Sequence, residues 1–281
     1  MRIIRADVMG MCFGVRDALK VIAAIGEPGE VTIHGELVHN EAVLTGLRGR
    51  GFAMVGESER RAMPGTSTVL ITAHGISDRE RTRLAAGGKR LIDTTCPLVT
   101  RAHQAARTLQ AQGYHVLVIG RPGHVEVQGI VEDLEHFDLI ESEHDVRTYP
   151  SSRLGVVCQT TTAERHVEAI RGAIASHNPD AEIRFIDTVC LPTKEHHRSL
   201  ERLLEQVDAM VVVGGWNSNN TKALVALCRE RGVRCAHVRE ASDLDPAWFV
   251  GVEAVGLTAG TSTLDATIEE VHRAIERFSP S

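Results

Sequence analysis

An internal repeat constrains the fold of this chain more than any other feature of its sequence. Residues 90–97 read RLIDTTCP, and residues 184–192 read RFIDTVCLP. A weaker copy occupies residues 2–12. Self-similarity of this kind indicates several similar structural units. The copies place three cysteines at equivalent positions: Cys12, Cys96 and Cys190.

Each cysteine is followed by the same order of patterns. Apolar runs of four to six residues alternate with helical patterns of ten to fifteen residues, which predicts an α/β fold with parallel strands. Helices are expected after the cysteines, over residues 15–24, 99–112 and 193–206. Each helix precedes a strand and a polar turn, and a second strand follows over residues 69–73, 154–158 or 255–258. Thr161 and Glu164 have capping-box spacing, which predicts that a helix begins at their turn.

The repeat predicts three α/β units of similar topology. We place the first unit over residues 13–96, the second over 97–190, and the third over 191–281 together with 1–12. The third unit has no final strand of its own, and residues 2–6 are available to supply it. We expect the units to be related by a pseudo-threefold axis, so that their cysteines lie near one point.

Composition excludes several classes of partner. The chain has 37 acidic and 31 basic residues, a net charge of −6 and 4% aromatic residues, so a broad nucleic-acid surface is not expected. No apolar run approaches the ~18 to 20 residues that span a bilayer. Charges interrupt the N-terminus before a signal-peptide core forms. We expect a soluble, cytoplasmic protein without a nucleic-acid or membrane partner.

The repeated cysteines favour an iron–sulfur cluster. None of the six cysteines forms a Cys-x-x-Cys pair, and structural zinc normally takes four ligands. Three cysteines suit a cluster in which one iron keeps no protein thiolate. An isolated cysteine is more commonly a small buried apolar residue. We expect that role for the cysteines outside the repeat, with Cys158 packed against the frame: Cys158, Cys228 and Cys235.

The polar turns that follow the strands offer donors for a compact anion. Their imidazole, hydroxyl and amide groups, together with turn amides and helix N-termini, suit such a ligand without a cluster of Lys or Arg. The candidate residues are His39, His74, His124, Thr160, Ser218, Asn219, Asn220 and Ser262.

Three of the polar turns begin with glycine, and one of these carries a carboxylate two residues after its candidate histidine. That residue is Glu126. In a pocket of cationic and hydroxyl groups it suits general-acid chemistry, and His124 can share the proton relay. The alternative is an exposed turn residue.

Other motifs give no further function. His196 and His197 lie in a charged helical run over residues 194–202, which predicts a solvated face. Neither a dinucleotide-binding fingerprint nor a phosphate loop is present.

Eight short motifs in order along the chain resemble the LytB-type 4-hydroxy-3-methylbut-2-enyl diphosphate reductases. Each motif alone is weak, but the series covers essentially the whole chain. They are Cys12-Phe-Gly-Val, Glu36-Leu-Val-His39-Asn, Ala73-His74-Gly75, Thr95-Cys96-Pro-Leu-Val, Gly123-His124-x-Glu126-Val, Gln159-Thr160-Thr161, Asn217-Ser218-x-Asn220 and Thr258-Ala-Gly-x-Ser262.

The resemblance implies a cloverleaf of three α/β units around a [4Fe–4S] cluster bound by the three repeated cysteines. It implies that the candidate polar residues bind the diphosphate substrate, and that Glu126, with His124 and Thr160, is catalytic. The implied reaction removes the C4 hydroxyl as water at the open iron and gives isopentenyl and dimethylallyl diphosphate. A ferredoxin or flavodoxin is the implied electron donor.

The sequence departs from the family pattern at several places: Asn219, Trp216, Cys158 and residues 192–199. The family usually has Ser at the position of Asn219, which borders the implied diphosphate site. Three alternatives therefore stay open: a paralogue that reduces a related allylic substrate, a non-catalytic iron–sulfur sensor or anion-binding module, and a zinc-stabilised α/β protein.

Overall fold

Parallel β-sheets form the frame of the protein. The computed structural model describes residues 1–38 and 40–278, and within these ranges the strands form three four-stranded sheets. Sheet A contains β1 (Arg2–Arg5), β12 (Ala254–Ala259), β10 (Ala209–Val213) and β11 (Arg234–Val238), in that order. Sheet B contains β3 (Ala53–Val55), β2 (Val31–His34), β4 (Thr68–Ile71) and β5 (Arg90–Asp93). Sheet C contains β7 (Phe137–Ile140), β6 (His115–Ile119), β8 (Arg153–Cys158) and β9 (Glu182–Phe185).

The sheets share one topology. Each has two central strands, and the edge strand beside the second central strand leads along the chain to a repeated cysteine. In sheet A this edge strand is β1, which pairs in parallel with β12 so that Arg2 lies opposite Ala254. The predicted α/β class with parallel strands is confirmed, and so is the prediction that residues 2–6 supply the missing strand.

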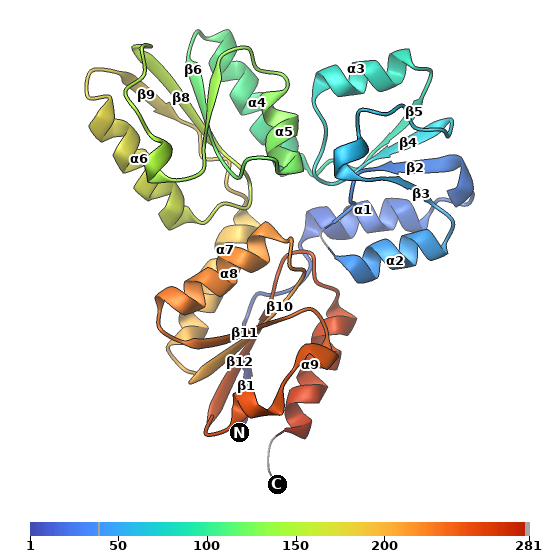
Figure 1. Cartoon of the computed structure of the whole chain (residues 1–281), viewed down its shortest axis with the longest axis vertical. Helices are drawn as coiled ribbons and strands as arrows, with labels where there is room; N and C mark the ends of the chain where they lie inside the picture. The colour runs from blue at the N-terminus through green and yellow to red at the C-terminus, as the bar shows by residue number, and fades with distance from the viewer. Residues whose placement is uncertain (39, 279–281) are drawn as a thin grey trace. The chain divides into compact units, whose positions relative to one another are not determined.

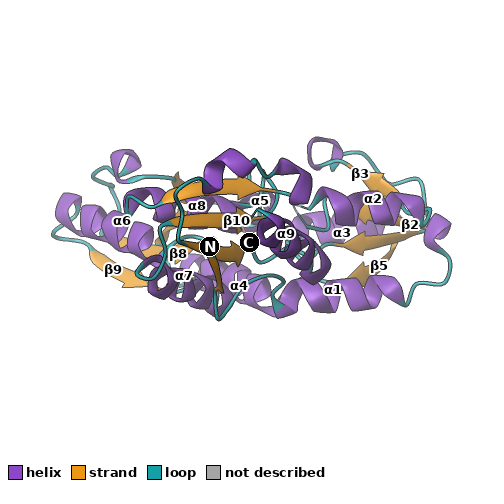
Figure 2. Ribbon diagram, turned by 90° about the horizontal axis from the view of Figure 1, so that it is seen from below, coloured by secondary structure: helices purple, strands orange, loops and turns teal. Residues whose placement is uncertain are grey.

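Helices cover both faces of each sheet (Figure 1). On sheet B, α3 (Asp78–Ala86) lies opposite α1 (Phe13–Ala23) and α2 (Glu41–Gly49). On sheet C, α4 (Pro97–Ala111) and α5 (Val125–Val131) lie opposite α6 (Glu164–His177). On sheet A, α7 (Leu191–Leu204) and α8 (Asn219–Glu230) lie opposite α9 (Asp265–Arg277). Figure 2 shows the strands in orange with these helices in purple beside them. Short 3₁₀ helices are η1 (Pro28–Glu30), η2 (Glu57–Glu59), η3 (Glu143–Asp145), η4 (Ala241–Asp243) and η5 (Pro246–Phe249).

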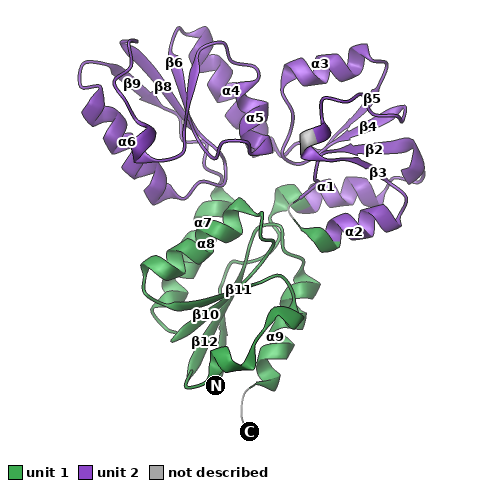
Figure 3. Ribbon diagram, viewed as in Figure 1, with its two compact units in different colours: residues 1–15, 39–42, 191–281 green, residues 16–38, 43–190 purple. Residues whose placement is uncertain are grey.

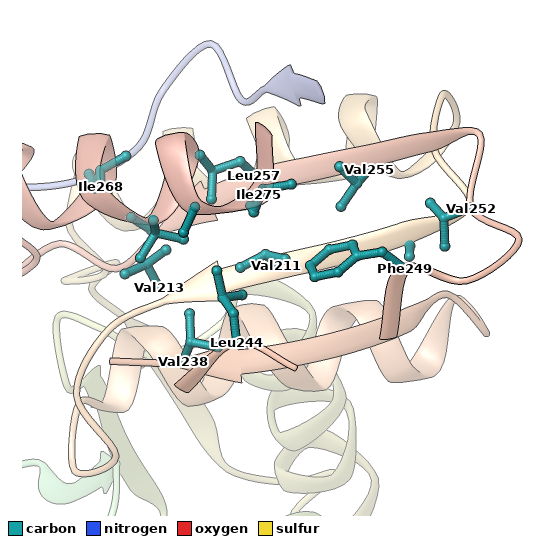
Figure 4. Packing of buried hydrophobic residues seen from close by; sticks show 14 residues of the cluster. Val211, Val213, Val238, Leu244, Phe249, Val252, Val255, Leu257, Ile268 and Ile275 are labelled. Carbon is teal, nitrogen blue, oxygen red and sulfur yellow. The ribbon is translucent and has the colours of Figure 1, made fainter. Parts of the chain in front are cut away.

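Side chains of a central strand alternate between two apolar layers. In β10, Val211 and Val213 pack in the cluster that contains Ile268 and Ile275 of α9 (Figure 4). Met210 of the same strand packs in the other cluster, against α7 and α8. Successive side chains of a strand point to opposite faces, so a strand buried on both faces reads as a continuous apolar run. Burial of each such side chain contributes about 1.5 to 3 kcal/mol.

The helices predicted after the repeated cysteines are present as α1, α4 and α7. The helix predicted near Thr161 is α6, but the capping-box prediction is wrong. The N-cap residue of α6 is Ala163, which makes no side-chain capping bond. Thr161 instead accepts a hydrogen bond from the side-chain amide of Gln159 at 3.2 Å.

The described residues divide into two compact units (Figure 3). The sheet A unit contains residues 1–15, 40–42 and 191–278, and the sheet B–C unit contains residues 16–38 and 43–190. The finer boundaries at residues 96 and 190 stay a prediction. Among the described residues, no helix is long and apolar enough to cross a membrane.

Candidate functional site

The polar turns begin where the first central strand of each sheet ends. His124 and Ser218 each lie five residues after such a strand, β6 or β10, and each is the N-cap of the next helix. His39 has the same offset from β2 but lies outside the described residues. Ligands collect at the carboxyl ends of parallel strands, so these turns are where a site is expected.

The repeated cysteines have equivalent backbone contacts. Each immediately precedes a helix, and each is a partly exposed cysteine outside any disulfide. Each backbone N–H donates to the carbonyl of the second residue beyond the neighbouring central strand: Cys12 to Thr261 (3.0 Å), Cys96 to Ala73 (3.0 Å) and Cys190 to Thr160 (2.9 Å). The repeat in sequence is therefore a repeat in structure. Helix N-termini carry partial positive charge, which stabilises thiolate ligands.

Glu126 is a buried carboxyl residue of the sheet B–C unit, with 2% of the residue exposed. It accepts two hydrogen bonds from Thr160, one from the backbone N–H at 2.6 Å and one from the hydroxyl at 3.0 Å. The backbone N–H of Glu126 donates to Nδ1 of His124 at 3.2 Å. An imidazole that accepts at Nδ1 carries its proton on Nε2 when neutral. Because Cys190 bonds the carbonyl of Thr160, one chain of hydrogen bonds connects His124, Glu126, Thr160 and Cys190. The alternative of an exposed turn residue at position 126 is wrong.

His74 meets His124 in the same unit. The rings are in an edge contact, with centroids 5.7 Å apart and planes at 89°. The next residue, Gly75, has φ +73°, and a Cβ there would lie 2.9 Å from Cγ2 of Thr95. Both the positive φ and the close approach require glycine. This turn therefore brings His74 next to the segment that carries Cys96.

A clamp of carboxylates joins the turns of sheets B and C. Asp133, just beyond α5, accepts hydrogen bonds from the backbone N–H groups of Asp78 (2.8 Å) and Arg79 (3.1 Å) in the first turn of α3. Glu132 accepts from the hydroxyl of Ser77 at 2.7 Å. Carboxylates satisfy the free N–H groups of a helix N-terminus and complement its dipole. The clamp therefore fixes the start of α3 against the end of α5. Because α3 follows His74 and α5 follows His124, the clamp also supports the turns that carry these two histidines.

The candidate donors of the sheet A unit surround the start of α8. Ser218 caps this helix, Asn219 is half-buried, and Asn220 is 1% exposed. Neither Oδ1 nor Nδ2 of Asn220 has a hydrogen-bond partner among the described residues. A buried polar group without a partner costs about 1 to 3 kcal/mol, so this amide is suited to meet a ligand. Beyond β12, the carbonyl of Ser262 accepts from Nδ2 of Asn40 at 2.9 Å.

The predicted site residues therefore form two groups. The sheet B–C unit brings together His74, His124, Glu126 and Thr160 with the backbones of Cys96 and Cys190. The sheet A unit carries Cys12, Ser218, Asn219, Asn220 and Ser262. Among residues 1–38 and 40–278, no three His, Cys, Asp or Glu side chains are close enough to hold a single metal ion.

The solvated face predicted for His196 and His197 is wrong, because both are buried, at 2% and 9% exposure. They lie on α7, which packs against α8 and β12. Burial lowers the pKa of His196 to about 4, partly offset by a hydrogen bond to the backbone of Ala259. Its ring is therefore neutral at pH 7.

Sequence reasoning assigned no role to Asp133. Asp133 has no local signal, because its partners are 54 and 55 residues away along the chain. Cys158 is fully buried in the core between sheet C and α6, as predicted.

The fold and these groups define a class: an α/β protein of three parallel-sheet units, with thiols at equivalent helix starts and polar turns suited to an anion. The chain matches the family described as "LytB protein" over residues 3–276, and it belongs to that family.

Named relatives match along nearly their full length. A 4-hydroxy-3-methylbut-2-enyl diphosphate reductase of Anaeromyxobacter sp. (strain Fw109-5) is 34% identical, with 95% of this chain and 94% of the relative covered. The enzyme of the same name from Aquifex aeolicus (strain VF5) is also 34% identical, with 98% and 96% covered.

Solved structures agree with this assignment. One, described as (E)-4-hydroxy-3-methyl-but-2-enyl diphosphate reductase, the terminal enzyme of the non-mevalonate pathway, is 33% identical with a TM-score of 0.69, covering 99% of this chain and 100% of that one. The E-1-hydroxy-2-methyl-but-2-enyl-4-diphosphate reductase of Plasmodium falciparum has a TM-score of 0.88 over 97% of this chain and 87% of that one. At 23% identity, the second structure supports the fold alone.

Proposed function

We propose that this chain is an oxidoreductase that reductively dehydroxylates 4-hydroxy-3-methylbut-2-enyl diphosphate. Two electrons and two protons remove the hydroxyl as water, and the allylic fragment gives isopentenyl and dimethylallyl diphosphate. Family membership and relatives of this name over nearly the full chain support the substrate. The observation that carries the proposal is the hydrogen-bonded chain from His124 through Glu126 and Thr160 to the backbone N–H of Cys190, because it connects a buried acid to the backbone of a proposed cluster ligand.

The proposed cofactor is a [4Fe–4S] cluster with three thiolate ligands: Cys12, Cys96 and Cys190. The residues fit this group, because all three are partly exposed cysteines outside any disulfide, at helix starts and with equivalent backbone contacts. When bound, such a cluster supplies electrons one at a time and has one iron without a protein thiolate. A ferredoxin or flavodoxin is the proposed source of those electrons.

Glu126 is the proposed proton donor to the departing hydroxyl. Its carboxyl group is shielded from water, and Thr160 holds both oxygens, so its orientation is fixed. A positioned acid of this kind typically contributes 10²- to 10⁴-fold to a rate. His124 is proposed to donate from Nε2, because its Nδ1 already accepts from the backbone of Glu126.

The proposed diphosphate donors are His39, His74, His124, Thr160, Ser218, Asn219, Asn220 and Ser262. The N-terminus of α8 offers backbone N–H groups and partial positive charge to an anion. The buried amide of Asn220 adds a donor that has no partner among the described residues. A hydrogen bond to a charged oxygen contributes about 1.5 to 3 kcal/mol. Several such bonds bind a diphosphate without a cluster of basic side chains.

The experiment is the Glu126→Gln substitution. The amide keeps an oxygen for the backbone N–H of Thr160 and a nitrogen for its hydroxyl, so the fold and the cluster content should persist. We expect turnover with a chemical reductant to fall by about 10²-fold or more. Glu135→Gln, which changes an exposed residue in the same unit, is the control. Full turnover in the Glu126 variant would remove this residue from the mechanism.

A further inference from the structure

Two cysteines outside the repeat lie against each other in the sheet A unit. Cys228 is in the last turn of α8 and is fully buried, whereas Cys235 is the second residue of β11 and is partly buried. Cys235 packs against the apolar cluster that contains Cys228, and the two thiols are close enough to shift each other's pKa. The backbone N–H of Val233 bonds the carbonyl of Cys228 at 3.0 Å and closes the turn between them.

The two thiols differ in chemistry. The hydrogen bond from Cys228 lowers the pKa of Cys235, and the positive charge of Arg229 acts in the same direction. The same contact, together with burial, raises the pKa of Cys228. Cys235 therefore ionises first, and it is also the thiol that solvent reaches. A thiolate with a second thiol beside it is the arrangement that oxidation converts to a disulfide.

We propose that Cys228 and Cys235 are a redox-modification site that forms an internal disulfide on reaction with a peroxide. The Cys235 thiolate attacks one oxygen of hydrogen peroxide, the O–O bond breaks, and the released hydroxide takes a proton to become water. The sulfur of Cys228 then attacks the sulfenic acid formed on Cys235, the S–O bond breaks, and the hydroxyl leaves with the Cys228 proton as a second water. The thiols lose two electrons and two protons, and peroxide is reduced to two waters. This chemistry is independent of the reaction proposed above.

The packing of the two elements favours the bond. A disulfide requires Cα atoms about 4.4 to 6.8 Å apart, and the turn closed by Val233 and Cys228 holds the end of α8 beside the start of β11. The bond would connect the end of α8 to the neighbouring strand β11, which already pack against each other. The partly buried state of Cys235 provides access to a small oxidant.

The test uses the anaerobically purified holoprotein treated with one equivalent of hydrogen peroxide, then denatured, alkylated and digested with trypsin. Cleavage after Lys222, Arg229, Arg234 and Arg239 places the two cysteines on separate peptides, residues 223–229 and 235–239. We expect these peptides linked, at a mass two hydrogens below their sum, and released by dithiothreitol. Alkylation of both cysteines while other cysteines are oxidised would overturn the proposal. Pairing of Cys235 with a different cysteine would also overturn it.

Matched variants separate the two steps. Cys228→Ser removes the second thiol, so the sulfenic acid on Cys235 should persist and react with dimedone. Cys158→Ser changes a buried cysteine of sheet C and should leave the yield of linked peptides unchanged. An absence of dimedone labelling in the first variant would contradict the proposed order of attack. The linked peptides of the wild-type protein test the proposal even if a variant fails to fold.

Discussion

Replacement of Asn220 by Leu should stabilise the protein while it weakens the substrate site. Asn220 is 1% exposed, and neither atom of its amide has a hydrogen-bond partner among the described residues. Leu has nearly the same shape without the polar atoms. Each unsatisfied buried group costs about 1 to 3 kcal/mol, so Asn220→Leu should raise the free energy of unfolding by about 2 kcal/mol. For a chain of this size that corresponds to roughly 4 °C in Tm.

The same substitution should damage catalysis. Loss of one hydrogen bond to a charged phosphate oxygen, about 1.5 to 3 kcal/mol, predicts a fall in kcat/KM of about 10- to 100-fold. Thermal unfolding of the substrate-free protein and anaerobic steady-state kinetics measure the two effects on one sample. A lower Tm together with unchanged kinetics would refute the reasoning, because it would mean that the amide has a structural role.

Asn178→Leu is the matched control. Asn178 is also buried, but its amide is satisfied: Oδ1 accepts from the backbone of Tyr149 at 2.8 Å, and Nδ2 donates to carbonyls of Arg147 and Ile174. Its substitution should lower the free energy of unfolding by about 2 to 3 kcal/mol, since it leaves buried backbone groups without partners. KM for the diphosphate should not change.

Three further predictions concern the frame and the thiols. Asp133→Asn should lower the free energy of unfolding by about 1 kcal/mol in thermal melts, because a neutral amide complements the N-terminus of α3 less well; an unchanged Tm would contradict the clamp. Burial lowers the pKa of His103 to about 4, so the unfolded chain binds its proton first and stability falls as pH drops from about 6.5 to 4. Between pH 7 and pH 4, the free energy of unfolding of His103→Leu should fall by about 3 kcal/mol less than that of the wild-type protein. An equal fall in both proteins would contradict a neutral ring at position 103. Cys96→Ser should reduce iron and sulfide content, whereas Cys158→Ser should leave both unchanged; equal loss in the two variants would reject the assigned ligands.

Much of the fold could be predicted because the repeat is local in sequence. The runs around Cys96 and Cys190 are nearly identical, so their strands, turns and helices could be aligned residue by residue. The same alignment predicted that the N-terminal residues complete sheet A, where Arg2 lies opposite Ala254. The repeat likewise placed His124 and Ser218 in equivalent polar turns after a strand, and the structure shows that both are helix N-caps.

The failures concern properties that depend on distant parts of the chain. His196 and His197 lie in a charged run, but their burial comes from the packing of α7 against α8 and β12. The orientation of Glu126 depends on Thr160, which is 34 residues further along the chain. The N-cap of α6 at Ala163 rather than Thr161 is a local exception, because Gln159, two residues earlier, bonds the Thr161 hydroxyl. Sequence patterns predict such groups as candidates but not their contacts.

The most direct measurement is an anaerobic assay of the cluster-loaded protein with 4-hydroxy-3-methylbut-2-enyl diphosphate and a chemical reductant, with products identified by NMR. We expect multiple turnovers that give isopentenyl and dimethylallyl diphosphate, and no turnover of the corresponding alcohol without the diphosphate. Substrate recovered unchanged from a protein with full iron and sulfide content, or reduction of the alcohol at a comparable rate, would contradict the proposed function.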